Sequence, residues 1–125
     1  RRRAPRAVVV VVDYLTVLGP DVAEYPAMPI SPDDLAALRA LGDALERATA
    51  AAAAAEGALL VSASRASRRH GVGAVQPWVT GPLPPEPAAT DPLLREPAAE
   101  PTPFHPNAEG MAAVADLVTT VLRNR

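Results

Sequence analysis

The sequence contains no cysteine and no lysine, and only four of its 125 residues are aromatic. Without cysteine the chain can form no disulfide framework and offers no thiolate for catalysis or metal binding. The twelve arginines and fourteen acidic residues leave a formal charge of −2, so the charge balance does not favour nucleic acid or an anionic membrane as a partner. Long apolar runs are also lacking, since no stretch approaches the roughly 20 residues that a membrane-spanning helix requires.

Hydrophobic residues make up 49% of the chain, which is enough to form a core. The length fits one domain, or one part of a larger domain. The arginine-rich start followed by Val8–Val12 superficially looks like an export leader. However, this apolar run ends at Asp13 and is shorter than the roughly 7–15 apolar residues of a leader. We therefore expect a soluble domain.

The first half of the chain has the pattern of a β-α-β unit. Residues 7–14 form an apolar run of mainly β-branched residues, typical of a central strand in a parallel sheet covered by helices on both faces. Ser31 and Pro32 predict the start of a long helix, and Gly57 predicts its end. The apolar positions of this helix are Leu35, Leu38, Leu41 or Gly42, and Leu45. Residues 58–61 then predict a second, parallel strand.

The second half is dominated by a proline-rich loop over residues 81–104, which is expected to be irregular or polyproline-like. A last helix is predicted from residue 106 or 107 to about 123. Its buried stripe is expected at Met111, Val114, Leu117 or Val118, and Val121. The order of elements predicts the α/β class. Because two strands are few for a self-standing sheet, we expect residues 1–125 to be one part of a larger α/β domain.

The most informative stretch is residues 104–111, Phe-His-Pro-Asn-Ala-Glu-Gly-Met. His105 lies in the last loop, and proline opens the final apolar helix. An imidazole titrates near neutrality, and a rigid helix start holds it in place. The pattern resembles the closing motif of the SGNH/GDSL hydrolases, a family of serine esterases and lipases.

Two further stretches are similar to the same family. Residues 8–18, which end Val-Asp-Tyr-Leu-Thr-Val-Leu, look like the strand and loop that follow the family's Gly-x-Asn-Asp segment. Residues 70–73 (His-Gly-Val-Gly) and 76–81 (Gln-Pro-Trp-Val-Thr-Gly) look like the loop of secreted actinobacterial members. The similarity covers nearly all of the chain in the right order, but only the second half of the family fold.

The resemblance implies a three-layer α/β/α, flavodoxin-like fold. It also implies hydrolysis of small-molecule or lipid carboxylic esters through an acyl-serine intermediate, with His105 as the catalytic base. No metal or organic cofactor is implied. Localisation outside the cell is likewise an expectation from the resemblance.

The chain departs from the family at the nucleophile. It contains no Gly-Asp-Ser motif and no Gly-x-Asn-Asp motif. The serine is therefore expected upstream of Arg1 or on another chain, and residues 1–125 alone are expected to lack esterase activity. The family usually has an acid three residues before the histidine, whereas this chain has Thr102, which can donate a hydrogen bond but supplies no charge. Some relatives orient the histidine with a main-chain carbonyl, and the carbonyls of Thr102 and Pro103 are the candidates here.

Trp78 and His70 are further candidates from the same loop region. Trp78 either lines an acyl pocket or anchors the long loop to the core, and anchoring is the more common role of a lone tryptophan. His70 lies among arginines and glycines, which favours a solvated loop residue over a catalytic one.

Asp13 and three serines have polar side chains near the predicted strand ends. Ligands gather at that edge of α/β sheets, but a hydrogen bond from Asp13 to a loop amide is the more common arrangement. The serines lack the strained, glycine-flanked elbow of a nucleophile, so turn and capping roles are expected for Ser62, Ser64 and Ser67.

A second hypothesis comes from a different class of function. In it, the chain is a non-catalytic α/β fragment or interaction module, and the proline-rich loop of residues 81–104 binds a partner. A nucleophile motif upstream of Arg1 would favour the esterase, and its absence would favour the interaction module.

Overall fold

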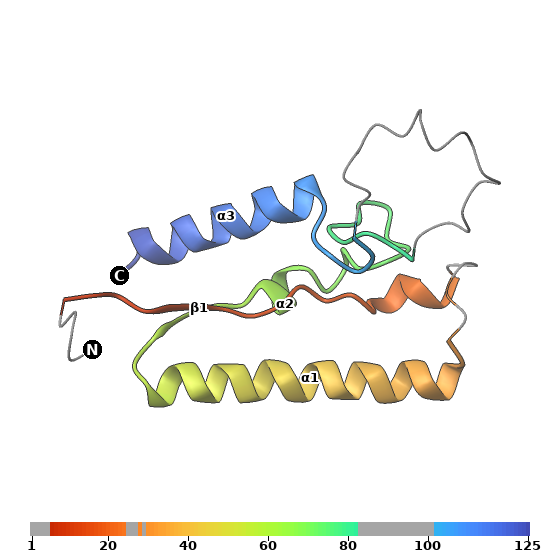
Figure 1. Cartoon of the computed structure of the whole chain (residues 1–125), viewed down its shortest axis with the longest axis horizontal. Helices are drawn as coiled ribbons and strands as arrows, with labels where there is room; N and C mark the ends of the chain where they lie inside the picture. The colour runs from red at the N-terminus through yellow and green to blue at the C-terminus, as the bar shows by residue number, and fades with distance from the viewer. Residues whose placement is uncertain (1–5, 25–27, 29, 83–101) are drawn as a thin grey trace, which may run out of the picture.

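The computed structural model describes residues 6–24, 28, 30–82 and 102–125 (Figure 1). Within these residues the chain is a small α/β protein with a two-stranded parallel sheet. Its elements in chain order are β1 (Val10–Val12), the 3-10 helix η1 (Pro20–Glu24), α1 (Pro32–Ala55), β2 (Leu59–Val61), α2 (Ala63–Ala66) and α3 (Ala108–Arg123). Residues 83–101, most of the proline-rich loop, lie outside the described part of the chain.

The predicted β-α-β unit is confirmed, with β1 and β2 parallel and Val11 paired with Leu60. Helices α1 and α3 lie on opposite sides of the strands in Figure 1, and both contact β2. The prediction for residues 7–14 is wrong in two respects. The strand itself covers only three residues, and Val8, Val9 and Val12 are each more than 40% exposed. The reason is that β2 is the only described neighbour of β1, so β1 is an edge strand of this sheet.

Helix α1 begins and ends where the sequence predicts. The Ser31 side chain caps it by accepting a hydrogen bond from the Asp34 amide at 3.1 Å, and Pro32 occupies the first turn. Gly57 follows the helix with a φ of 58°, the left-handed conformation that glycine adopts without steric cost. The predicted apolar stripe is only partly covered, because Leu35 is buried whereas Leu38, Leu41 and Leu45 are exposed among the described residues.

Helix α3 begins after Asn107, whose side chain accepts a hydrogen bond from the Gly110 amide at 2.8 Å. Val114, Leu117, Val118 and Val121 are partly buried as predicted, but Met111 is 59% exposed. The buried face is centred on Gly110, which packs against the main chain of Trp78. Since successive helical residues are about 100° apart, Met111 faces away from this contact.

The buried core lies where the chain leaves the two strands. Leu15 follows β1, and Ala63 follows β2. Further buried apolar residues come from η1, α1 and the loop after α2: Val22, Leu35, Val72 and Val79. Val114 and Leu117 of α3 pack against this cluster. The core therefore supports the loops at the carboxyl ends of the strands, the edge at which ligands of α/β sheets gather.

Candidate functional site

His105 lies near the carboxyl end of β1. Tyr14, two residues after this strand, donates its hydroxyl to the main-chain carbonyl of Phe104 at 3.1 Å. On the other side of the histidine, Pro106 forms an antiparallel bridge with Val79. The His105 side chain is exposed. The exposed imidazole therefore belongs to the loop that leads into α3.

The surroundings of His105 select one tautomer of the neutral ring. Nδ1 lies 2.9 Å from the carbonyl oxygen of Pro103. A carbonyl oxygen only accepts hydrogen bonds, so Nδ1 must carry the proton. Nε2 is then left with its lone pair, and no described residue forms a hydrogen bond with it. In the neutral ring, this tautomer is the one that a general base requires.

Thr102 contributes to this site through its main chain. The Thr80 hydroxyl donates a hydrogen bond to the Thr102 carbonyl, and the His105 amide donates to the same oxygen at 3.3 Å. Among the described residues, no hydrogen bond joins the Thr102 hydroxyl to the His105 ring. Of the two carbonyls that the sequence nominates, that of Pro103 is the one in contact with the imidazole.

Trp78 lies beside His70 rather than beside His105. The two rings are stacked, with centroids 4.1 Å apart and an interplanar angle of 7°. The Trp78 side chain is partly buried against the core, and His70 Nδ1 lies 2.8 Å from the Gln76 carbonyl. These contacts correspond to the anchoring role expected of Trp78. They also place His70 in a loop turn of its own, without a hydrogen bond to His105 in the described structure.

Asp13 and Ser64 form a buried pair between the ends of the two strands. The Asp13 carboxylate accepts hydrogen bonds from the Ser64 amide at 2.8 Å and from its hydroxyl at 2.6 Å. Asp13 thus binds a main-chain amide as expected, but that amide lies in the first turn of α2 and not in a loop. Ser67 is fully buried and donates to the Ala63 carbonyl while accepting from the Thr16 amide. Both serine hydroxyls are committed to structural hydrogen bonds, as their expected roles imply.

Replacing Asp13 with alanine is expected to lower the free energy of unfolding by about 3 kcal/mol, because two buried donors of Ser64 lose their acceptor. Ser64→Ala removes only the hydroxyl and is expected to cost about 1 kcal/mol. Urea unfolding followed by circular dichroism measures both values. Equal unfolding midpoints for the two variants would contradict this account of the pair.

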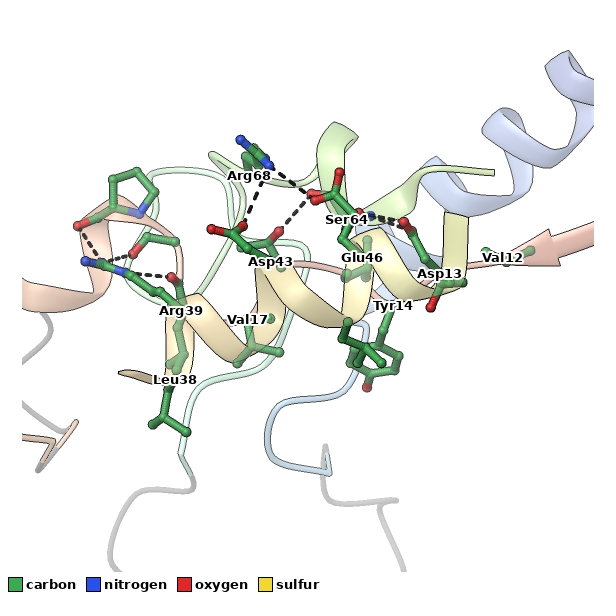
Figure 2. A pocket seen from close by; sticks show the side chains of 18 residues that line it. Val12, Asp13, Tyr14, Val17, Leu38, Arg39, Asp43, Glu46, Ser64 and Arg68 are labelled. Carbon is green, nitrogen blue, oxygen red and sulfur yellow. Dashed lines mark hydrogen bonds and ion pairs between the residues drawn. The ribbon is translucent and has the colours of Figure 1, made fainter. Parts of the chain in front are cut away.

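A cavity of about 720 Å³ opens between the loop after β1 and helix α1 (Figure 2). Its walls include Tyr14, Leu38 and Leu45 together with Asp13 and Glu46. Among the described residues, those that line it include neither His105 nor Trp78. The predicted site residues therefore do not share one pocket. In the sequence, the signal for this cavity was the helical spacing of apolar residues along α1, of which Leu38 and Leu45 line the cavity.

Arg39 was not singled out by the sequence, and the structure gives it a clear role. It reaches from α1 to the loop after β1, where it donates hydrogen bonds to the main-chain carbonyls of Leu18, Gly19 and Pro20 (Figure 2). A guanidinium group with several donors in one plane suits this kind of carbonyl cluster. Arg39 thereby fixes one wall of the cavity.

Charged residues border the cavity, with Asp43 and Glu46 on α1 and Arg68 just after α2 (Figure 2). Arg68 lies 3.2 Å from Glu46 and 3.7 Å from Asp43, and Arg65 lies 3.3 Å from Glu46. Partial burial by itself raises the pKa of Glu46. The hydrogen bonds and charges of Arg68 and Arg65 outweigh this effect and hold the pKa below its ordinary value of 4.5.

The lowered pKa of Glu46 predicts a pH-dependent contribution to stability. Because the folded state holds the carboxylate more strongly than the unfolded state, this contribution is complete above the ordinary pKa and is lost as the pH falls through the folded-state pKa. Glu46→Gln is expected to cost roughly 0.5 kcal/mol at neutral pH, since the arginines are largely exposed. The difference from wild type should shrink as the pH falls below 4.5 in urea unfolding, and a difference that stays the same at every pH would refute the prediction.

No family model, curated protein or solved structure matches this chain. Of the described helices, none is long and apolar enough to cross a membrane. Over residues 6–24, 28, 30–82 and 102–125, no three histidine or carboxylate side chains converge in a group that could hold a metal ion.

Proposed function

We propose that this chain supplies the general base, His105, of a serine hydrolase that cleaves carboxylic esters. The observation that carries the proposal is the 2.9 Å contact between Nδ1 of His105 and the Pro103 carbonyl. It leaves Nε2 unprotonated on an exposed ring near the ends of the strands. The similarity of residues 104–111 to the closing motif of SGNH/GDSL hydrolases supports the same role.

The proposed fold is the second half of a three-layer, flavodoxin-like domain. Support comes from the parallel order of β1 and β2 and from the two helices on opposite sides of them. The open edge of β1 leaves room for further strands of such a sheet. By the same resemblance, the protein is expected to be an exported enzyme.

In the proposed reaction, Nε2 of His105 removes the proton from a serine hydroxyl supplied from outside residues 1–125. The serine oxygen attacks the ester carbonyl, and the resulting imidazolium gives its proton to the leaving alcohol. His105 then takes a proton from water as the water oxygen attacks the acyl-serine, and the imidazolium returns that proton to the serine oxygen as the free acid departs. The imidazolium is stabilised by the Pro103 carbonyl dipole instead of a carboxylate.

The test is to express the reading frame that continues upstream of Arg1 and to label it with a serine-directed fluorophosphonate. A Gly-Asp-Ser motif is expected in that upstream segment, with labelling at its serine. His105→Ala should abolish the labelling, and His70→Ala should not. An upstream segment without such a motif, or labelling unaffected by His105→Ala, would overturn the proposal.

A further inference from the structure

The segment Thr102–His105, here named the His105 turn, has an unusual backbone. The His105 amide donates to the Thr102 carbonyl at 3.3 Å, which closes a four-residue turn. Proline occupies its second position, and Phe104, in its third, has a φ of 60°. This is the pattern of a type II turn, which favours glycine or asparagine where this chain has phenylalanine. A non-glycine residue persists in that conformation only when its surroundings impose it.

Thr80 is the first group that imposes this conformation. Its main chain brackets the turn, since its carbonyl accepts from the Phe104 amide at 3.0 Å and its amide donates to the His105 carbonyl at 2.9 Å. Its side chain adds a third connection. The Thr80 hydroxyl donates its one proton to the Thr102 carbonyl. The oxygen of this hydroxyl also accepts a hydrogen bond from the His105 amide at 3.2 Å.

Tyr14 is the second such group. Its hydroxyl donates to the Phe104 carbonyl at 3.1 Å, and that carbonyl belongs to the peptide between Phe104 and His105. Tyr14 follows β1 directly after Asp13, whose carboxylate is buried. The tyrosine therefore connects the strained peptide to a rigid part of the sheet, 90 residues away along the chain.

These contacts affect the His105 ring because the carbonyl that accepts from its Nδ1 is part of the turn. The Pro103 carbonyl that receives the Nδ1 proton belongs to the peptide on the other side of Phe104. Rotation of either peptide moves that oxygen away from the ring. The residues that hold the turn therefore decide which nitrogen of His105 carries the proton.

We infer that Thr80 and Tyr14 are positioning residues, whose hydroxyl groups hold the His105 turn and thereby keep Nε2 of His105 free as a proton acceptor. The inference rests on the proposed function for its catalytic meaning. The positional effect itself can be measured on the chain alone. Thr102 supplies no charge in the place of the carboxylate that usually orients such a histidine. The Pro103 carbonyl contacts the ring instead, and the two hydroxyls hold the turn that carries this carbonyl.

The experiment is long-range ¹H–¹⁵N nuclear magnetic resonance of the histidine rings at about pH 8.5, where an ordinary histidine is neutral. In the wild-type chain, His105 is expected in the Nδ1–H form. In Thr80→Val and in Tyr14→Phe, the ratio of Nδ1–H to Nε2–H should fall by roughly threefold to tenfold, the effect of one ordinary hydrogen bond. Thr80→Ser keeps the hydroxyl and should retain the wild-type ratio.

Two controls come from the same molecule. Thr119→Val removes a hydroxyl that donates to the Ala115 carbonyl in α3, and it should leave His105 unchanged. His70, the only other histidine, has its own bond from Nδ1 to the Gln76 carbonyl and should give a constant spectrum in every variant. Tyr14→Phe provides the answer if Thr80→Val does not fold.

The outcomes separate the two proposals. If wild-type His105 is in the Nδ1–H form and both hydroxyl variants keep it, the positioning role of Thr80 and Tyr14 is wrong while the proposed base remains. If wild-type His105 is in the Nε2–H form, the nitrogen assigned as base is already protonated and the proposed function fails. In the complete hydrolase, the two variants should lower kcat and leave KM unchanged.

Discussion

Replacing Gly110 with alanine is expected to lower the free energy of unfolding by about 2 kcal/mol or more, the cost of forcing an atom into a closed contact. The new Cβ would lie 2.1 Å from the Trp78 carbonyl oxygen and 3.0 Å from its carbonyl carbon. Both are main-chain atoms, and the neighbouring Asn107 amide donates to the same oxygen. Helix α3 must therefore move away from the loop.

Gly42→Ala is the matched control for this prediction. Gly42 also lies within a helix, α1, but apart from its chain neighbours and the nearby backbone of α1, no atom of the described residues lies within 4 Å of the position that its Cβ would occupy. The same substitution should raise stability there by about 0.5–1 kcal/mol, because alanine favours the helix. Urea unfolding of the two variants should give shifts of opposite sign. A Gly110→Ala variant as stable as wild type or more stable would show that the contact between Gly110 and Trp78 is not tight.

Replacing His105 with alanine is expected to lower kcat/KM by about 10³-fold or more. The nucleophile and the base act as a unit, so the loss of the base removes most of the rate enhancement that the two provide together. The measurement is hydrolysis of a short-chain nitrophenyl ester by the polypeptide that includes the upstream segment. His70→Ala is the control and should change the rate by less than about threefold, within the effect of one weak hydrogen bond.

Residues 1–125 alone should hydrolyse the same ester no faster than buffer. Hydrolysis by this chain that His105→Ala abolishes would mean that the nucleophile lies within it. If Ser64 or Ser67 were that nucleophile, its hydroxyl would have to leave the buried hydrogen bond that holds it. Equal rates for His105→Ala and wild type in the longer polypeptide would refute the assignment of the base.

Local sequence signals were reliable for the ends of the helices. Ser31 and Asn107 both act as caps, and Gly57 adopts the left-handed conformation after α1. Each of these features depends on residues within four positions of one another. Burial was predicted less well, because Leu41 and Met111 fit an apolar periodicity and yet are exposed. Periodicity gives the apolar face of a helix, but it does not say what covers that face.

The sequence nominates the residue of the candidate site but not its geometry. It nominates His105 with two carbonyls as candidates to orient it, and the structure has the Pro103 carbonyl in contact with the ring. No pattern in the sequence indicates the left-handed Phe104 or the part played by Tyr14. Nor does any pattern in the sequence indicate that Trp78 lies beside His70 and apart from His105, since these residues lie in loops whose paths are set by distant contacts.

The sequence by itself determined the α/β class, the start and end of α1 and α3, and the pairing of two parallel strands. These features follow from caps, turns and apolar runs, in which neighbouring residues interact whatever the rest of the chain does. Only the tertiary structure decided the tautomer and orientation of His105. We infer that this choice depends on hydrogen bonds made by Thr80 and Tyr14 with residues 25 and 90 positions away in the sequence, and such bonds exist only once the sheet and the loops have come together.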